Sequence, residues 1–259
     1  MQLEQCAVPQ PAPVWADDAA RFYLEGIEQS NYAERVGGLL HSLLADTDSL
    51  LDVGAGGGTL PASFLSRSAA WTAVEPNAFL ADALQDLGSR EGFRLQVLRA
   101  VWQQLGELSL QPHDTVLAAS MCGPLEQPEV FWKYLAPLCK RRMVWSVPAQ
   151  RGPRQACLSG ALPAALHGED ETPAVELILK RLPSSLQPHA VHVADWTFSY
   201  RFADFSAADS WFQQRFNPAC RVSTGVALRA HLEQVAVNDG PAVIIHAPKR
   251  SACLVWDFQ

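Results

Sequence analysis

The sequence predicts an α/β domain in which a mostly parallel β-sheet carries helices on both faces. Between residues 46 and 148, short apolar segments typical of buried strands alternate with amphipathic helical segments. The first strand runs into LDVGAGGGTL, where four glycines fall within five positions; this composition favours a sharp turn from a strand into a helix. The chain has 259 residues, of which 48% are hydrophobic, enough for one substantial core. We therefore expect a single domain over residues 1–259.

The first half of the chain predicts a helical cap followed by the alternating elements. In residues 1–45 the cap begins near Asp17, from which apolar residues recur at spacings near three and four as far as Leu44. Residues 46–148 then form the alternating part, in which Asn77 is a candidate helix N-cap. The expected strands are 49–53, 70–74, 93–98, 114–119 and 143–147, and the expected helices are 60–66, 79–87 and 130–138.

The pattern changes after Pro148. Residues 149–220 are rich in proline and aromatic residues, and we interpret them as an insertion that forms a lid over a substrate. Their aromatic residues line an apolar pocket, or alternatively cover the edge of the sheet. Within this insertion, DWTFSYRF alternates aromatic and polar residues and predicts an extra strand with one buried face. Residues 221–259 then give a closing helix over 225–234 and two last strands, 241–246 and 252–258, with APKRS as a hairpin turn.

Charge and cysteine content limit the classes of partner and compartment. The formal net charge of −7 argues against a general electrostatic grip on nucleic acid. No apolar run reaches the length of a membrane span, and the first residues lack the pattern of a signal peptide. The six cysteines are scattered without a CxxC pair, so we expect reduced thiols in the cytoplasm and no metal site.

The glycine-rich turn and a later acid together predict a nucleotide site. Gly54, Gly56 and Gly58 have a GxGxG spacing, and Glu75 follows Gly54 by 21 residues at the end of the predicted second strand. A carboxylate at that place can accept hydrogen bonds from both hydroxyls of a ribose. A dinucleotide fingerprint has Gly or Ala at the position of Thr59, so NAD is the less favoured ligand. Asp52, just before the turn, would also repel a pyrophosphate.

The stretch Asp52–Gly58 resembles motif I of the class I S-adenosylmethionine-dependent methyltransferases, and residues 13–40, before the core, resemble the N-terminal helices of members that act on small molecules. This resemblance implies a Rossmann-like, mostly parallel seven-stranded sheet with an antiparallel last strand. Residues 46–148 would be its cofactor-binding half, and S-adenosylmethionine its cofactor, with S-adenosylhomocysteine as the product. AVEPN at 73–77 looks like the second motif, RAVWQQL at 99–105 resembles the region after the third strand, and DTVLAASMCGP at 114–124 resembles the fourth motif.

The resemblance also implies roles for individual residues. Asp52 would counter the positive charge of the methionine end, Glu75 would hold the ribose, and Pro76 would lie against the adenine. Arg99 and Val101 stand where many members place an acid, so a backbone group or Gln103 is left to recognise the adenine amino group. The full set of expected cofactor-binding residues is Tyr32, Asp52, Gly54, Ala55, Gly56, Gly58, Glu75, Pro76, Val101, Trp102, Ser120 and Met121.

The reaction implied is an SN2 methyl transfer, in which alignment and desolvation of the nucleophile can supply much of the catalysis. An oxygen nucleophile favours a general base, and His189 and His192 in the insertion are candidates by type. Tyr32 is a third candidate, which contacts the cofactor or the substrate, or simply packs its helix against the sheet. Three alternatives stay open: a protein or RNA substrate, a non-catalytic protein that retains the fold, and an NAD-binding enzyme.

Overall fold

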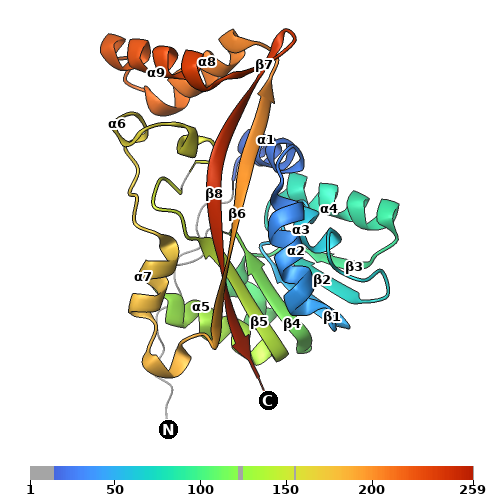
Figure 1. The fold of residues 1–259 in the computed structure, drawn as a ribbon. Helices are drawn as coiled ribbons and strands as arrows, with labels where there is room; N and C mark the ends of the chain where they lie inside the picture. The colour runs from blue at the N-terminus through green and yellow to red at the C-terminus, as the bar shows by residue number, and fades with distance from the viewer. Residues whose placement is uncertain (1–14, 122–124, 155, 259) are drawn as a thin grey trace.

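The computed structural model describes residues 15–121, 125–154 and 156–258. It has an eight-stranded mixed sheet flanked by helices (Figure 1), so the predicted fold class is confirmed. The strands are β1 (Ser49–Val53), β2 (Ala70–Val74), β3 (Arg94–Leu98), β4 (His113–Ala119), β5 (Cys139–Pro148), β6 (Ala190–Phe202), β7 (Val237–Asp239) and β8 (Ala242–Asp257). The α-helices are α1 (Asp17–Glu28), α2 (Tyr32–Leu44), α3 (Thr59–Ala62), α4 (Ala78–Glu91), α5 (Pro128–Leu135), α6 (Ala164–His167), α7 (Ala174–Arg181), α8 (Phe205–Phe216) and α9 (Val222–Val235).

The strands are ordered β3-β2-β1-β4-β5-β8-β6. Strands β1 to β5 are parallel, whereas β8 runs antiparallel to both β5 and β6. Seven strands lie on this path as expected, and the eighth is the short β7, which pairs with β8 beside it. Strands β2 and β3 lie on one side of β1, and β4 and β5 lie on its other side, so β1 and β4 flank the topological switch point. Open α/β sheets bind their ligands at such a point, beyond the carboxyl ends of the strands.

Two apolar cores lie on the two faces of the sheet. On one face, buried residues of α2, including Val36 and Leu40, pack with Leu50, Trp71 and Leu84. On the other face, α5 and α7 cover β1, β4, β5 and β8, and Figure 1 shows these helices on opposite sides of the sheet. Side chains at neighbouring positions of one strand point to opposite faces. Because both faces are buried, nearly every residue of these strands is apolar.

The helical cap consists of two helices, α1 and α2, with a break between them at residues 29–31. The break at Gln29–Asn31 places polar side chains along the open edge of β6, whose unpaired N–H groups would otherwise face solvent. Three consecutive side chains accept these hydrogen bonds: Asn31 Oδ1 from Thr197 N at 2.7 Å, Ser30 Oγ from Ser199 N at 2.9 Å, and Gln29 Oε1 from Arg201 N at 2.7 Å. The cap is thereby fixed to the edge of the sheet, and α1 turns over the carboxyl ends of the strands.

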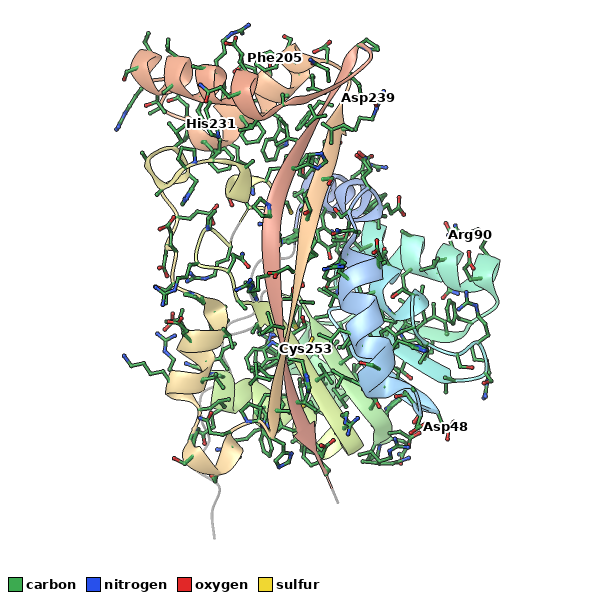
Figure 2. The ribbon with its side chains drawn as sticks, in the orientation of Figure 1. Asp48, Arg90, Phe205, His231, Asp239 and Cys253 are labelled. Atoms are coloured by element: carbon green, nitrogen blue, oxygen red, sulfur yellow. The ribbon has the colours of Figure 1, made fainter. Side chains whose placement is uncertain are left out.

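The expected hairpin at APKRS is wrong, because residues 242–257 form one continuous strand, β8. Thirteen residues of β6 pair with β8 without interruption, from Ala190 opposite Val255 to Phe202 opposite Val243. Strand β5 ends at Pro148, opposite Ser251, so Pro248 lies beyond that neighbour, where a missing N–H is tolerated. The β6–β8 ribbon extends past the sheet and carries α8 and α9 at its tip, near Phe205, His231 and Asp239 (Figure 2).

Residues 149–220 contribute to the sheet as well as covering it. They hold α6, α7 and α8, and they also supply β6, the strand at the sheet edge. The extra strand expected in DWTFSYRF is present as the second half of β6. Within the described ranges, no helix is both long and apolar enough to cross a bilayer.

Candidate functional site

The turn after β1 is held in shape by the end of β2. The Gly54 N–H donates to the carbonyl oxygen of Val74 at 2.8 Å, and Gly54 has a φ of 72°, which favours glycine. A Cβ on Gly54 would lie 2.9 Å from the Cβ of Met121. A Cβ on Gly58, whose φ is 78°, would lie 2.3 Å from Leu84 Cδ1. Glycine is therefore required at both ends of the turn, because the chain closely approaches Met121, just after β4, at one end and Leu84 of α4 at the other.

The side chain of Glu75 is built into this turn. Its Oε2 accepts a hydrogen bond from Gly56 N and its Oε1 accepts one from Asn77 N, both at 2.8 Å. Burial raises the pKa of Glu75 and these two backbone hydrogen bonds oppose the rise. An ionised carboxylate accepts about four hydrogen bonds, so each oxygen retains capacity for one more donor. The carboxylate is therefore oriented to receive two further N–H or O–H groups.

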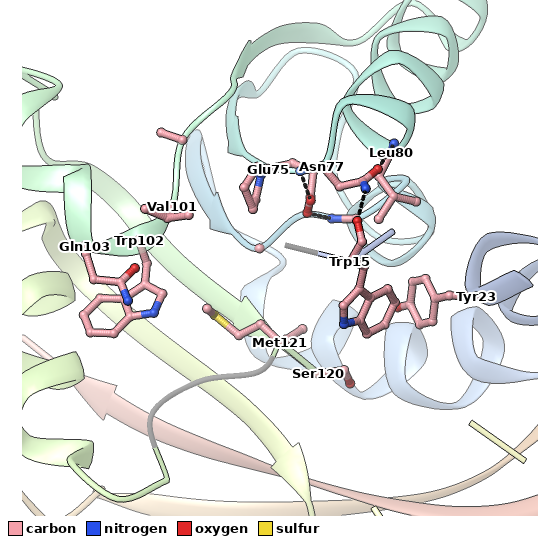
Figure 3. A pocket seen from close by; sticks show the side chains of 15 residues that line it. Trp15, Tyr23, Glu75, Asn77, Leu80, Val101, Trp102, Gln103, Ser120 and Met121 are labelled. Carbon is pink, nitrogen blue, oxygen red and sulfur yellow. Dashed lines mark hydrogen bonds between the residues drawn. The ribbon is translucent and has the colours of Figure 1, made fainter. Parts of the chain in front are cut away.

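A pocket opens beside Glu75 at the switch point of the sheet. It encloses about 830 Å³ of empty space, a volume that includes its open mouth. One wall is formed by Trp15 and Tyr23, whose ring centroids are 5.2 Å apart, and Val101–Gln103 form the other wall, with Met121 between them (Figure 3). Asn77 fixes the position of Trp15 in the first wall, because its Nδ2 donates a hydrogen bond to the Trp15 carbonyl oxygen at 2.9 Å. Asn77 also caps α4 as predicted, through Leu80 N.

A second, smaller cavity lies on the other side of the turn and is lined by Asp52, Tyr32 and Gly58. Asp52 is 2% exposed, and its Oδ2 has no hydrogen-bond partner among the described residues. Burial raises the pKa of Asp52 to about 8, while the nearby Trp71 indole opposes the rise; the indole N–H itself lies outside hydrogen-bond geometry. A buried carboxyl without a partner is costly, so this position favours a cationic ligand.

Tyr32 and Ser120 join the two cavities. Their hydroxyl oxygens are 3.0 Å apart, and the Tyr32 ring packs on Trp196 at a centroid distance of 4.5 Å. Ser120 has a φ of 52°, a conformation that costs a non-glycine residue energy and that is often found at functional sites. Desolvation raises the pKa of Tyr32 well above its ordinary value. Tyr32 therefore keeps its proton at neutral pH, and its hydroxyl group can either donate to Ser120 or accept from it.

The chain was compared with known proteins. No protein-family model and no curated protein matches it. One similar structure comes from work on the conversion of a disulfide bond into a thioacetal group during echinomycin biosynthesis; it has 14% sequence identity and a TM-score of 0.50, with 85% of this chain and 80% of that one covered. An apo mycolic acid cyclopropane synthase has 14% identity and a TM-score of 0.48 over 92% and 99% of the two chains. A coclaurine N-methyltransferase bound to N-methylheliamine and S-adenosylhomocysteine has 14% identity and a TM-score of 0.45 over 85% and 71%.

At these identities the likeness is one of fold. The strand order 3-2-1-4-5, completed by an antiparallel strand between β5 and the edge, decides which fold it is. The chain has the fold of the class I methyltransferases. In this methyltransferase fold the pocket lies where the expected cofactor would bind, beyond the carboxyl ends of β1, β2 and β4.

The methyltransferase resemblance selected twelve residues, and the structure brings all of them to the two cavities. Gly54, Gly56, Glu75, Pro76, Val101, Trp102, Ser120 and Met121 line the larger pocket. Tyr32, Asp52, Ala55 and Gly58 line the smaller one. Within the described ranges, no cluster of three or more His, Cys, Asp or Glu side chains has metal-binding geometry.

The two candidate histidines of the methyltransferase reaction lie elsewhere. His189 Nδ1 accepts a hydrogen bond from Asp257 N. Asp257 pairs with Arg142 near the start of β5, so His189 lies at the amino ends of the parallel strands, whereas the glycine turn lies at their carboxyl ends. His192 pairs with Cys253 on β8. At about 4.8 Å per strand, the positions of β5 and β8 separate it from β4 by roughly 14 Å. Neither histidine lines either cavity. Cys122, which follows Met121 in the sequence and is a possible nucleophile by residue type, lies outside the described residues.

Sequence reasoning missed Tyr23, which lines both cavities. Its pKa is raised well above the ordinary value, first by burial and then by the neighbouring Tyr32. Along α1 it has the spacing of a core aromatic residue, and no local pattern separates a pocket residue from a packing one. Its role depends on the angle at which α1 crosses the sheet, which the break at Gln29–Asn31 sets.

Proposed function

We propose that this protein is an S-adenosylmethionine-dependent methyltransferase that acts on a small molecule. The proposal rests on one observation: two buried carboxyl groups, those of Glu75 and Asp52, lie on opposite sides of one glycine turn. Glu75 is oriented to receive two hydroxyl donors. Asp52 Oδ2 has no hydrogen-bond partner among the described residues, and this buried carboxyl favours a cation. One ligand with a ribose diol and a cationic amino-acid end satisfies both.

The residues present fit this ligand. Glu75 would hold the ribose hydroxyls with its two free acceptor positions, and Gly54 leaves the backbone bare beside them. Asp52 would face the ammonium group, which stabilises its ionised form. NAD fits less well, because its pyrophosphate offers Asp52 no cationic partner and because Thr59 stands where the dinucleotide fingerprint has Gly or Ala.

S-adenosylmethionine supplies a methyl group on a positively charged sulfur, which is already reactive toward nucleophiles. The chain's own residues would then align the nucleophile with this methyl group and exclude water from it. Trp15 and Tyr23 exclude water from the mouth of the pocket, and the hydrogen bond between the Tyr32 and Ser120 hydroxyl groups fixes the direction of both. None of the described residues that line the two cavities is a histidine, and Tyr32 is protonated at neutral pH, so we propose that alignment contributes more than general-base catalysis.

The acceptor is proposed to be a small molecule because α1 covers this end of the sheet, with its Tyr23 lining both cavities. The net charge of −7 also disfavours nucleic acid. We further propose a cytoplasmic location, which rests on the scattered cysteines, and a lid role for the parts of residues 149–220 outside β6.

The test is calorimetric titration of the purified protein with S-adenosylmethionine, S-adenosylhomocysteine and NAD in parallel. We expect micromolar binding of the two sulfur nucleotides and none of NAD. A labelled methyl donor with a panel of small-molecule acceptors then identifies the substrate. Binding of NAD alone would overturn the proposal, and binding without transfer to any small molecule, peptide or RNA would favour a non-catalytic role.

A further inference from the structure

The outer edge of β6 is protected along only one half of the strand. β6 is the last strand on the path of the sheet. The N–H groups of its odd-numbered residues point outward, as the hydrogen bonds from Thr197, Ser199 and Arg201 to the break between α1 and α2 show. The next outward carbonyl, that of Asp195, accepts a hydrogen bond from Arg35 Nε at 3.3 Å. Between the start of β6 and this residue, no outer-edge backbone group has a partner among the described residues.

Two valines lie in this unprotected half. Val191 and Val193 are 43% and 53% exposed, and as odd-numbered residues they direct their N–H and C=O groups outward. Their cross-strand neighbours on β8, Leu254 and Ala252, are buried in the core that α5 and α7 cover. The apolar surface of that face therefore continues outward to the two valines and ends at solvent. An exposed apolar edge with free N–H and C=O groups is a template for another strand.

We propose that this edge is a dimer interface, in which β6 of a second copy of this chain pairs antiparallel across a two-fold axis at His192. The position of the axis follows from the free backbone groups. Val191 and Val193 offer both a donor and an acceptor, and His192 lies midway between them. Val191 then pairs with Val193 of the second copy, and Val193 with Val191. Each pair exchanges both N–H···O bonds, so main-chain hydrogen bonds join the two sheets and the valines of both copies leave water.

The side chains beyond the valines are complementary in the same register. It places His189 opposite Asp195 of the second copy, once on each side of the axis. His189 Nδ1 accepts a hydrogen bond from Asp257 N, so its Nε2 carries the ring proton and is a donor. Asp195 is exposed, and its hydrogen bonds from Arg250 leave each carboxylate oxygen a further acceptor position. A donor therefore meets an acceptor at both ends, which favours a second copy of this chain over an unrelated strand.

The flanks of the edge limit the length of the pairing. Pro188 has no N–H at one end, and Asn31 occupies Thr197 N at the other. The interface is therefore short, and we expect a dimer that forms at micromolar rather than nanomolar concentrations. Neither valine lines either cavity, so this inference does not depend on the proposed function.

Sedimentation velocity of the full chain, from low micromolar to submillimolar concentration, tests the proposal. We expect a monomer–dimer equilibrium for wild-type protein. Val193→Pro should weaken dimerisation by at least about tenfold, because it removes one N–H donor from each copy. That N–H faces away from β8, so the sheet itself keeps its hydrogen bonds. Val193→Lys should have the same effect. Val226→Lys is the matched control, since Val226 is 65% exposed on α9, and it should dimerise as wild-type protein does.

Disulfide trapping tests the register. His192→Cys would place two cysteines directly opposite each other, in a non-hydrogen-bonded pair with Cα atoms about 4.5 Å apart, which a disulfide can bridge. This variant should form a covalent dimer on mild oxidation. Ala194→Cys lies on the same face, but about 14 Å from its counterpart, and should not. Wild-type protein, which has the exposed Cys220, supplies the baseline.

Three outcomes would overturn the proposal. Wild-type protein that stays monomeric at every concentration would leave this edge to a strand of another protein. A dimer that Val193→Pro and Val193→Lys both leave unchanged would mean that the copies meet at another surface. Covalent dimers from Ala194→Cys but not from His192→Cys would exclude a two-fold axis at His192.

Discussion

Asp52→Asn should stabilise the protein while weakening its ligand binding. In the folded chain the pKa of Asp52 is about 8, raised by burial, against about 3.9 in an unfolded chain. At pH 7 the unfolded state has therefore lost this proton and the folded state has kept it. The difference destabilises the folded state by about 1.4 kcal/mol per pH unit between the two pKa values, or roughly 4 kcal/mol at pH 7. Asparagine does not ionise, so it removes this contribution.

The sign follows from the raised pKa. The penalty is absent below about pH 4, where both states are protonated, and it grows as the pH rises to about 8. The asparagine N–H groups introduce a separate burial cost of about 1–3 kcal/mol, but this cost does not vary with pH. The discriminating quantity is thus the slope of the stability difference between variant and wild type.

Urea unfolding of both proteins at pH 5, 6, 7 and 8 measures that slope. We expect the advantage of the variant to rise by about 1.4 kcal/mol for each pH unit. Asp86→Asn removes one exposed carboxylate from α4 and controls for the change in net charge. A difference that stays constant from pH 5 to pH 8 would refute the reasoning, since Asp52 would then be ionised in the folded protein despite its burial.

Binding should change in the opposite direction. A cationic ligand favours the ionised carboxylate, so wild-type protein should release close to one proton on binding S-adenosylhomocysteine at pH 7. Calorimetry in two buffers of different ionisation enthalpy measures this proton. Asp52→Asn should release none and bind more weakly. A site that lowers stability in the absence of its ligand is a common cost of function.

Three further substitutions test the site and the packing around it. Glu75→Ala should weaken S-adenosylhomocysteine binding by about 2 kcal/mol, the loss of charge-assisted hydrogen bonds, whereas Glu91→Ala on the surface should leave calorimetric affinity unchanged. Gly58→Ala should destabilise the fold by about 3 kcal/mol in urea, because strain and overpacking combine; Gly92→Ala, with a φ of 73° and open space around it, isolates the strain alone. His192→Ala should retain normal turnover in a methyl-transfer assay, and a loss of more than about tenfold in kcat, roughly 1.4 kcal/mol, would return it to the reaction.

The sequence by itself determined the glycine turn and its acid. In a parallel sheet the carboxyl ends of neighbouring strands meet at one edge, so a GxGxG after β1 and an acid after β2 must lie together. Gly56 N and Glu75 Oε2 are accordingly 2.8 Å apart. The N-cap Asn77 was equally predictable, because capping depends on residues three positions apart. These features are local, or they follow from topology alone.

Only the tertiary structure decided the features that depend on long-range pairing. The APKRS segment has the composition of a turn, yet its pairing with β6 keeps it extended, since thirteen continuous pairs outweigh local preference. The same pairing places His192 at the sheet edge, away from the pocket. The orientation of α1, and with it Tyr23, is set by side-chain hydrogen bonds to β6 across about 170 residues of sequence. The isolation of Asp52 depends on every element packed around it, and no pattern of neighbouring residues records such packing.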